Sequence, residues 1–277
     1  LGVLLASLAG IPVGKFLVAI VVPGILLAVL LCLYIIIRCT LQPHLAPAYD
    51  VKRYSFAEKM ADTVKYILPL GLIVFLVLGL ILLGIATPTQ SAVLGAVGTI
   101  GLAAAYRRLN WGVLRESLKE TLKVSVMIFM IMVGSTTFSQ ILSFTGVTTE
   151  LVKFVTALDL QPFVLLALIQ VVLLFMGCFM EPMSIMMMTL PVLMPLAKAM
   201  EFDPLWFGVI MLVNMQVATF SPPFGMDLFA MKGVAPKDIT MGDIYRAVLP
   251  FIALNMFMML LIMVFPQLAL WLPGMVK

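Results

Sequence analysis

Long apolar runs alternate with short polar connections along most of this chain. A helix needs about 20 apolar residues to cross the hydrocarbon core of a bilayer. Five runs are that long without interruption: 14–37, 66–84, 88–105, 121–143 and 247–272. A sixth run, 205–232, is long enough but contains the stretch "ATFSPPFGMDLF". The pattern predicts an all-α polytopic membrane protein with six spanning helices, one of which is discontinuous.

The run 163–198 has a different pattern. It is apolar on both sides of a short stretch, "CFMEPMS", that contains a glutamate, a proline and a serine. We interpret it as a re-entrant helical hairpin, whose two arms meet at a tip inside the membrane.

The composition agrees with this class. The chain has 277 residues, of which 63% are hydrophobic and 11% charged, and its mean hydropathy is +1.19. A typical soluble domain carries about 25% charged residues, so this chain lacks the polar groups to cover a soluble surface. The lipid bilayer is the solvent that this composition fits.

The net charge of +4 does not indicate nucleic-acid binding, because the bases lie in short connections between apolar runs. The single histidine, His44, lies in a predicted loop and alone makes no metal site. Cys32, Cys39 and Cys178 show neither metal-ligand spacing nor a disulfide pattern. We expect no transition metal and no nucleic-acid partner.

The bases also predict the orientation, because cytoplasmic loops are enriched in Lys and Arg. Two crossings separate the connections 38–65 and 106–123, so both can be cytoplasmic. Their bases are Arg38, Lys52, Arg53, Lys59, Lys65, Arg107, Arg108, Arg115, Lys119 and Lys123. The connection 144–162 and the segment 198–204 then lie outside. The broken run returns Lys232, Lys237 and Arg246 to the inside, which leaves both termini outside.

The break in 205–232 carries the functional prediction. Pro222 and Pro223 lack N–H groups, so two helical hydrogen bonds are lost. At membrane depth, freed carbonyls are tolerated only beside protein or a water-filled cavity. Together with the hydroxyls of Thr219 and Ser221, they form an oxygen-rich group suited to a dehydrated Na⁺. The half-helix after Gly225 would present a partially positive N-terminus to an anionic substrate.

The second interruption is the hairpin tip. Glu181 lies between two apolar arms, and Pro182 follows it. A carboxylate near the bilayer centre costs a few kcal/mol and needs a partner. A tip adjacent to the Ser221–Gly225 break would supply one, since transporter sites are built from discontinuous elements that meet near the midplane.

Structural alternatives remain open for these residues. A simple kink would explain one proline, and Glu181 could lie at the interface between two tilted helices. Asp227 is expected in or near the cavity, but it could pair with a lysine. The five polar side chains of "GSTTFSQ" (134–140), Thr137 among them, could bond between helices or line the transport path. Thr89 is a candidate cap for the helix that follows it.

Several segments, in this order along the chain, resemble the large membrane subunit of tripartite ATP-independent periplasmic (TRAP) transporters. They are "IVVPGILLAVL", "GIATPTQSA", "GCFMEPMSIMMMTLPVLMP", "FDPLWFGVIMLVNMQVATFSPPFG", "LFAMKGVAP" and "FPQLALWLP". The resemblance implies two inverted repeats, each with a hairpin and a broken helix, in an elevator-type carrier. The chain starts in mid-pattern without a Met, so we interpret it as a fragment that holds the second half of this architecture.

The resemblance also implies a division of the chain. Residues 1–13 would be the tail of the first repeat, and 14–143 the scaffold and connecting helices. Residues 163–232 would be the transport part, and 247–277 the C-terminal helix. The Na⁺ and substrate positions of the family fall on the hairpin tip and the broken helix, with these residues: Met180, Glu181, Ser184, Thr219, Ser221, Pro222 and Gly225.

The function implied is Na⁺-driven uptake of a small organic anion, such as a dicarboxylate or sialic acid, across the bacterial inner membrane. Na⁺ would be the coupling ion, without another cofactor. A periplasmic substrate-binding protein and a small four-helix membrane subunit would be the partners.

Other functions are weighed on the same residues. A stand-alone carrier of dicarboxylate/Na⁺ symporter architecture would need no binding protein. A non-transporting membrane scaffold would tolerate Leu at Ser221 and Gly225. An intramembrane enzyme is disfavoured, because the sequence has no H-E-x-x-H motif and no Ser/His pair.

Overall fold

The computed structural model describes residues 1–43, 55–158, 160–236 and 238–275. These residues form helices and no strand, which confirms the all-α prediction. The expectations for His44, Lys52, Arg53 and Lys237 lie outside the described residues.

Within the described ranges, five helical stretches are long and apolar enough to cross a membrane. They are Val13–Leu41, Phe56–Ile81, Trp111–Phe144, Pro182–Ala199 and Met241–Val264. Two further apolar helices, Pro162–Gly177 and Pro204–Thr219, are shorter. The chain is therefore a polytopic membrane protein. The number of crossings and the elevator arrangement stay predictions.

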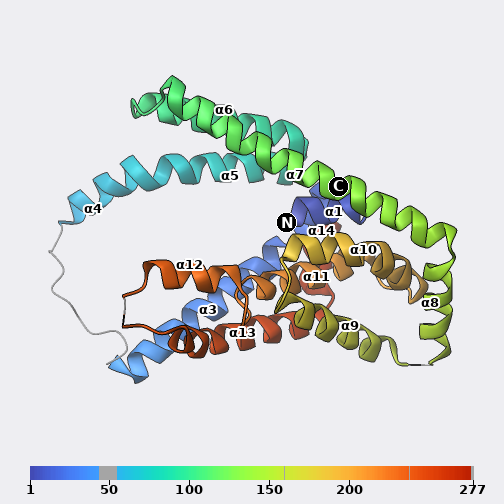
Figure 1. The fold of residues 1–277 in the computed structure, drawn as a ribbon. Coiled ribbons are helices and arrows are strands. Elements are labelled where there is room, and N and C mark those ends of the chain that lie inside the picture. The colour runs from blue at the N-terminus through green and yellow to red at the C-terminus, as the bar shows by residue number, and fades with distance from the viewer. Residues whose placement is uncertain (44–54, 159, 237, 276–277) are drawn as a thin grey trace. The chain divides into compact units, whose positions relative to one another are not determined.

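The chain divides into two compact units. The first comprises Leu1–Leu33 and Ile128–Met275, and the second comprises Tyr34–Met127. Figure 1 gives the helix labels. The helices with residues in the first unit are α1 (Gly2–Leu8), α2 (Val13–Ala19), α3 (Val21–Leu41), α7 (Trp111–Phe144), α8 (Val147–Ala157), α9 (Pro162–Gly177), α10 (Pro182–Ala199), α11 (Pro204–Thr219), α12 (Met226–Val234), α13 (Met241–Val264) and α14 (Gln267–Met275).

Helix α11 is the centre of the first unit, packed by α9, α10, α13 and α2. Its buried face includes Phe207, Ile210 and Met215. Gly208 lets α2 approach, because a Cβ there would lie 3.0 Å from a ring carbon of Phe16. On the α13 side, the indole N–H of Trp206 donates to the carbonyl of Ile262 at 2.7 Å. These contacts fix the helix that leads into the break.

The predicted hairpin is present as an antiparallel helix pair, α9 and α10, joined by a short turn (Figure 1). Three consecutive helices of this region start with a proline, at Pro162, Pro182 and Pro204. Proline suits this position, because the first helical N–H has no partner inside the helix. The prolines thus set the points where the two arms and α11 begin.

The second unit contains α4 (Phe56–Asp62), the π-helical turn η2 (Thr63–Ile67), α5 (Leu68–Leu82) and α6 (Pro88–Ala105). Helices α5 and α6 pack through glycines, because a Cβ on Gly95 would lie 3.0 Å from Val77 and one on Gly98 would lie 3.4 Å from Ile73. Phe75 on α5 is 75% exposed, which suits contact with lipid.

Two predicted connections are shorter than expected. Residues 56–65 of the connection 38–65 are helical, and so are residues 111–123 of the connection 106–123. In both places the helix begins about ten residues before the apolar run that predicted it. On α7 the charged part is supported by ion pairs one turn apart, such as Lys123–Glu120 at 2.5 Å.

Three other boundaries differ from the prediction, and in each a proline or a cap explains it. The run 14–37 is divided at Ile20, because Pro23 has no N–H for the carbonyl of Ala19. The run 247–272 ends its long helix at Val264, just before Pro266. Thr87, not Thr89, caps α6, and Gln90 completes the capping box.

Candidate functional site

The break predicted in the run 205–232 separates α11 from α12. Helix α11 ends at Thr219 and α12 begins at Met226, and the Pro222–Pro223 peptide is cis. A Cβ on Gly225 would lie 2.8 Å from the main-chain Cα and carbonyl carbon of Phe220. Only a glycine fits there, so Gly225 sets how tightly the chain turns back.

The hairpin tip packs directly against this break. A Cβ on Gly177, the last residue of α9, would lie 2.6 Å from the Cβ of Ala218 on α11. Beyond it, the rings of Phe179 and Phe224 lie 6.2 Å apart, centroid to centroid. The two interruptions that the sequence predicts are therefore neighbours in the fold.

The two hydroxyl groups beside the break each donate a hydrogen bond to a carbonyl of the preceding turn. Ser221 Oγ donates to the carbonyl of Val217 at 2.8 Å, and Thr219 Oγ1 donates to the carbonyl of Gln216 at 2.9 Å. Each hydrogen is used, while the oxygen lone pairs stay available as acceptors. Ser221 is only 3% exposed. Such oxygens suit a hard cation that has shed water.

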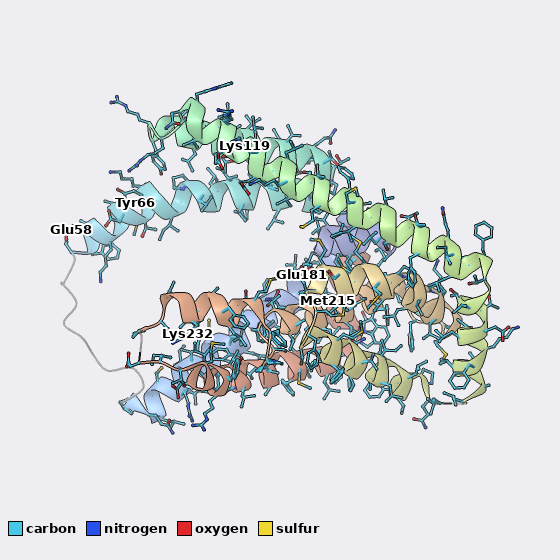
Figure 2. The ribbon with its side chains drawn as sticks, viewed as in Figure 1. Glu58, Tyr66, Lys119, Glu181, Met215 and Lys232 are labelled. Atoms are coloured by element: carbon cyan, nitrogen blue, oxygen red, sulfur yellow. The ribbon has the colours of Figure 1, made fainter. Side chains whose placement is uncertain are left out.

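The hydrogen-bond partner of the Glu181 carboxylate is Ser184, and not the Ser221–Gly225 break that the sequence predicted. Glu181 caps α10, and its Oε2 accepts from the Ser184 N–H at 3.1 Å and from the Ser184 hydroxyl at 3.4 Å. The expected partner at the Ser221–Gly225 break is thus replaced by the adjacent turn. The reason is that the first N–H groups of a helix lack partners, and a carboxylate at the cap supplies one. Figure 2 labels Glu181 at the start of α10 and Met215 on α11.

Met180 and Ser184 open onto a cavity of about 430 Å³ on the side of the hairpin that faces the end of α7. Phe138 and Ser135 line its other wall. Thr137, the predicted residue of that segment, does not line it. Its hydroxyl donates to the carbonyl of Val133 in its own helix at 2.9 Å. Ser135, in the same polar stretch, makes the predicted bond between helices, because its hydroxyl donates to the carbonyl of Met187 on α10 at 2.7 Å.

Asp227 was expected in or near the cavity beside the break. It is exposed in the first turn of α12 and lines a cavity of about 240 Å³ together with Phe220 of the break and residues of α13. Among the described residues it forms no ion pair with a lysine, so that alternative is not supported.

Tyr245 is a residue of this region that sequence reasoning missed. Its hydroxyl, on α13, donates to the carbonyl of Pro223 at 2.9 Å. A carbonyl freed by the break is thus satisfied from the neighbouring helix. Tyr245 gives little signal in the sequence, because the contact depends on how α13 folds back.

The ligand atoms available at the tip and break are hydroxyl, carboxylate and main-chain oxygens. In the part of the chain that the structure describes, no three His, Cys, Asp or Glu side chains gather at one place. The chemistry of this donor set is that of alkali and alkaline-earth cations rather than of soft metals.

A helical hairpin whose tip meets a broken helix, among apolar helices of spanning length, is an arrangement typical of secondary transporters. Residues 1–268 match the family model described as the tripartite ATP-independent periplasmic transporter, DctM component. The chain belongs to this family, the TRAP transporter large permease subunits.

Named relatives agree with this assignment. The chain is 32% identical to the C4-dicarboxylate TRAP transporter large permease protein DctM of Pseudomonas aeruginosa over 265 residues, covering 95% of this chain and 60% of the relative. It is 28% identical to the sialic acid TRAP transporter large permease protein SiaM of Vibrio cholerae over 262 residues, covering 94% and 60%.

A third relative, the isethionate TRAP transporter permease protein DctMQ of Oleidesulfovibrio alaskensis, is 32% identical over 200 residues, covering 72% of this chain and 31% of that protein. The chain spans about 60% of the length of the first two relatives. These relatives are permeases and not enzymes, in agreement with the sequence prediction.

Proposed function

We propose that this chain is part of a carrier that takes up a small organic anion with Na⁺, as the large permease subunit of a TRAP transporter. The observation that carries the proposal is the contact between the hairpin tip at Gly177–Phe179 and the break at Ala218–Phe224. Family membership supports the transport class, because relatives are named for the uptake of C4-dicarboxylates, sialic acid and isethionate.

The Na⁺ would bind among main-chain oxygens of the break and the oxygens of Ser221 and Thr219. Both hydroxyls already donate to carbonyls of the preceding turn, so their lone pairs can accept a cation. Ser221 is buried, which strengthens an electrostatic interaction by excluding water.

The anion would bind beside this cation, at the start of α12 and next to Met180 and Ser184 of the tip. The positive end of the α12 helix dipole and the Na⁺ together would balance the charge of a carboxylate or sulfonate. Glu181, which is bonded to Ser184, would hold the tip in shape rather than face the anion. Because hairpin and break pack together, we propose that they move as one part in an elevator-type cycle.

The proposed setting is the bacterial inner membrane, with six crossings and one re-entrant hairpin. A periplasmic substrate-binding protein would deliver the anion, and a small four-helix membrane subunit would complete the carrier. The names of the relatives, which refer to carboxylates and a sulfonate, support a small organic acid as the substrate.

The test is uptake by proteoliposomes that contain the full-length protein and its partners. Radiolabelled succinate, sialic acid and isethionate would each be offered with an inward Na⁺ gradient and with K⁺ in its place. The proposal predicts that at least one probe accumulates only with Na⁺. Equal uptake with either ion would contradict Na⁺ coupling, and uptake without the binding protein would favour a stand-alone carrier.

A further inference from the structure

We propose a second anion site on this chain, in the cavity beside Lys198, at the opposite end of α10 from the hairpin tip. It would receive the organic anion before the tip does. This inference rests on the proposed function for the identity of the anion, but the site itself is tested below without transport.

The cavity is of ligand size, and its lining combines polar side chains with the apolar Leu8, Leu190 and Met194. Its volume is about 510 Å³, within the range of small-molecule sites. The end of α7 contributes Ser135, Thr136 and Ser139, and α10 contributes Pro191 and Lys198. Lys198 is the single charged side chain of this lining, so the cavity favours an anion over a cation.

The hydrogen bonds within the lining determine which of its side chains can still donate a hydrogen to a ligand and which can only accept one. Ser135 Oγ gives its hydrogen to the carbonyl of Met187, and Thr136 Oγ1 gives its hydrogen to the carbonyl of Met132. The hydrogens left for a ligand belong to the Lys198 ammonium and the Ser139 hydroxyl. Lys198 and Ser139 would bind a carboxylate or sulfonate, and the oxygens of Ser135 and Thr136 would accept from hydroxyl groups elsewhere on the substrate.

The site is distinct from the tip but adjoins it. Ser184 and Lys198 are 198 − 184 = 14 residues apart on one helix, which is about 21 Å along its axis. Ser135 lines both this cavity and the cavity of Met180 and Ser184. The two cavities therefore adjoin at Ser135 on α7, and successive stretches of α10 line them. The charge pattern of the sequence predicts that the Lys198 end lies outside, so an incoming anion would meet Lys198 first.

A purely structural explanation of Lys198 is available, since a base in the last turn of a helix interacts favourably with the helix dipole. That role requires a positive charge but no cavity and no ligand. The two explanations make different predictions for Ser139, which is on α7: only an anion site requires that the charge of Lys198 attract an anion to Ser139.

The first experiment measures the electrostatic field in the cavity with thiol reagents. Ser139→Cys is made in the full-length carrier that also carries Cys32→Ser, Cys39→Ser and Cys178→Ala. Labelling by an anionic methanethiosulfonate (sulfonatoethyl) and a cationic one (trimethylammonioethyl) is compared from the outside, with and without Lys198→Gln. We expect Lys198→Gln to lower the anion-to-cation rate ratio at least about threefold, as a Coulomb interaction a few ångströms long predicts.

The control is Thr137→Cys, which lies on α7 but outside the cavity lining. Its rate ratio should not respond to Lys198→Gln. Succinate, sialic acid or isethionate should also protect Ser139→Cys, and not Thr137→Cys, from the anionic reagent. An unchanged ratio at Ser139→Cys, or labelling from the cytoplasmic side alone, would overturn the outer site.

The second experiment uses uptake. In the full-length carrier with Cys32→Ser, Cys39→Ser, Cys178→Ala and any further cysteine replaced, Lys198→Cys should raise KM about tenfold with little change in maximal velocity. Treatment with the cationic reagent should restore KM, and treatment with the anionic reagent should raise it further. Equal effects of both reagents would contradict an anion site. If the unmodified carrier transports none of the probes, the proposed function fails, while the labelling ratio still decides the outer site.

Discussion

The hydroxyl of Ser135 on α7 donates a hydrogen bond of 2.7 Å to the carbonyl of Met187 on α10. That carbonyl is the one that Pro191 deprives of its helical partner, because the proline nitrogen four residues later has no hydrogen. The serine thus replaces a missing main-chain donor, and it does so at the point where two cavities along α10 meet.

A double-mutant cycle tests this relationship. Ser135→Ala should lower stability by about 1 kcal/mol, since it leaves the Met187 carbonyl without a donor. In a Pro191→Ala background the restored N–H can bond to Met187, so the effect of Ser135→Ala should nearly vanish. Thermal unfolding of the purified full-length carrier in detergent measures both. An equal cost of Ser135→Ala in the two backgrounds would show that Pro191 is unrelated to this bond.

The contact between hairpin tip and break predicts that one added methyl group is costly at Gly177 and harmless at a glycine outside the contact. Gly177→Ala would place its Cβ 2.6 Å from the Cβ of Ala218, so the helices must separate. We expect a loss of about 1–3 kcal/mol, as for other overpacked contacts, together with weaker Na⁺-dependent uptake. Adding Ala218→Gly should recover much of both.

The matched control for that change is Gly134→Ala, where a Cβ would meet nothing within 4 Å. It should leave stability within about 0.5 kcal/mol of the unmodified protein. If Gly177→Ala and Gly134→Ala behave alike, the tip and the break are not in contact.

Gly225 is predicted to tolerate no side chain. A Cβ there would lie within 2.8–2.9 Å of main-chain atoms of Phe220 and Ser221, which cannot rotate away. Gly225→Ala should therefore abolish Na⁺-dependent uptake while the protein still inserts in the membrane. Gly233→Ala, in α12 and with open space around its Cα, is the control and should transport normally. Normal uptake by Gly225→Ala would mean that the turn is not part of the site.

A buried amide pair holds α9 to α11. The Nδ2 of Asn214 donates to the carbonyl of Gln170 at 2.8 Å and to its Oε1 at 3.0 Å. Asn214→Leu should destabilise the protein by about 1–3 kcal/mol, because it leaves the Gln170 amide buried without its partner. Gln170→Leu combined with Asn214→Leu should cost less than the sum of the single changes. Strict additivity in thermal unfolding would contradict a coupled pair.

Much of the fold could be predicted from the sequence. The hairpin and the break were located to within a residue or two, because Pro182, Pro222 and Pro223 interrupt apolar runs in ways that a helix cannot absorb. The charged ends of helices were harder. The bases of residues 111–123 indicate a polar connection, yet they lie on a helix whose polar surface is stabilised by pairs such as Glu120–Lys123.

The meeting of hairpin tip and break could be predicted from the sequence, and the contacts within it less so. The hydroxyls of Thr219 and Ser221 follow from the broken helix, but the partner of Glu181 did not. An isolated carboxylate in an apolar run suggests a distant partner, whereas the turn brings Ser184 within reach. Bonding between helices was expected for the stretch that contains Ser135, but its acceptor, the Met187 carbonyl on α10, could not be identified, nor could the bond from Tyr245 to the Pro223 carbonyl in the break. Such contacts depend on packing that no local pattern specifies.

The most direct measurement is equilibrium binding of radioactive Na⁺ to the purified full-length carrier. The account predicts saturable binding that Na⁺ but not K⁺ displaces, and a dissociation constant raised about tenfold, or about 1.4 kcal/mol, by Ser221→Ala. Thr156→Ala, which removes an exposed hydroxyl bonded to its own helix, should leave binding unchanged. Unaltered Na⁺ affinity in Ser221→Ala would contradict the claim that the broken helix holds the cation.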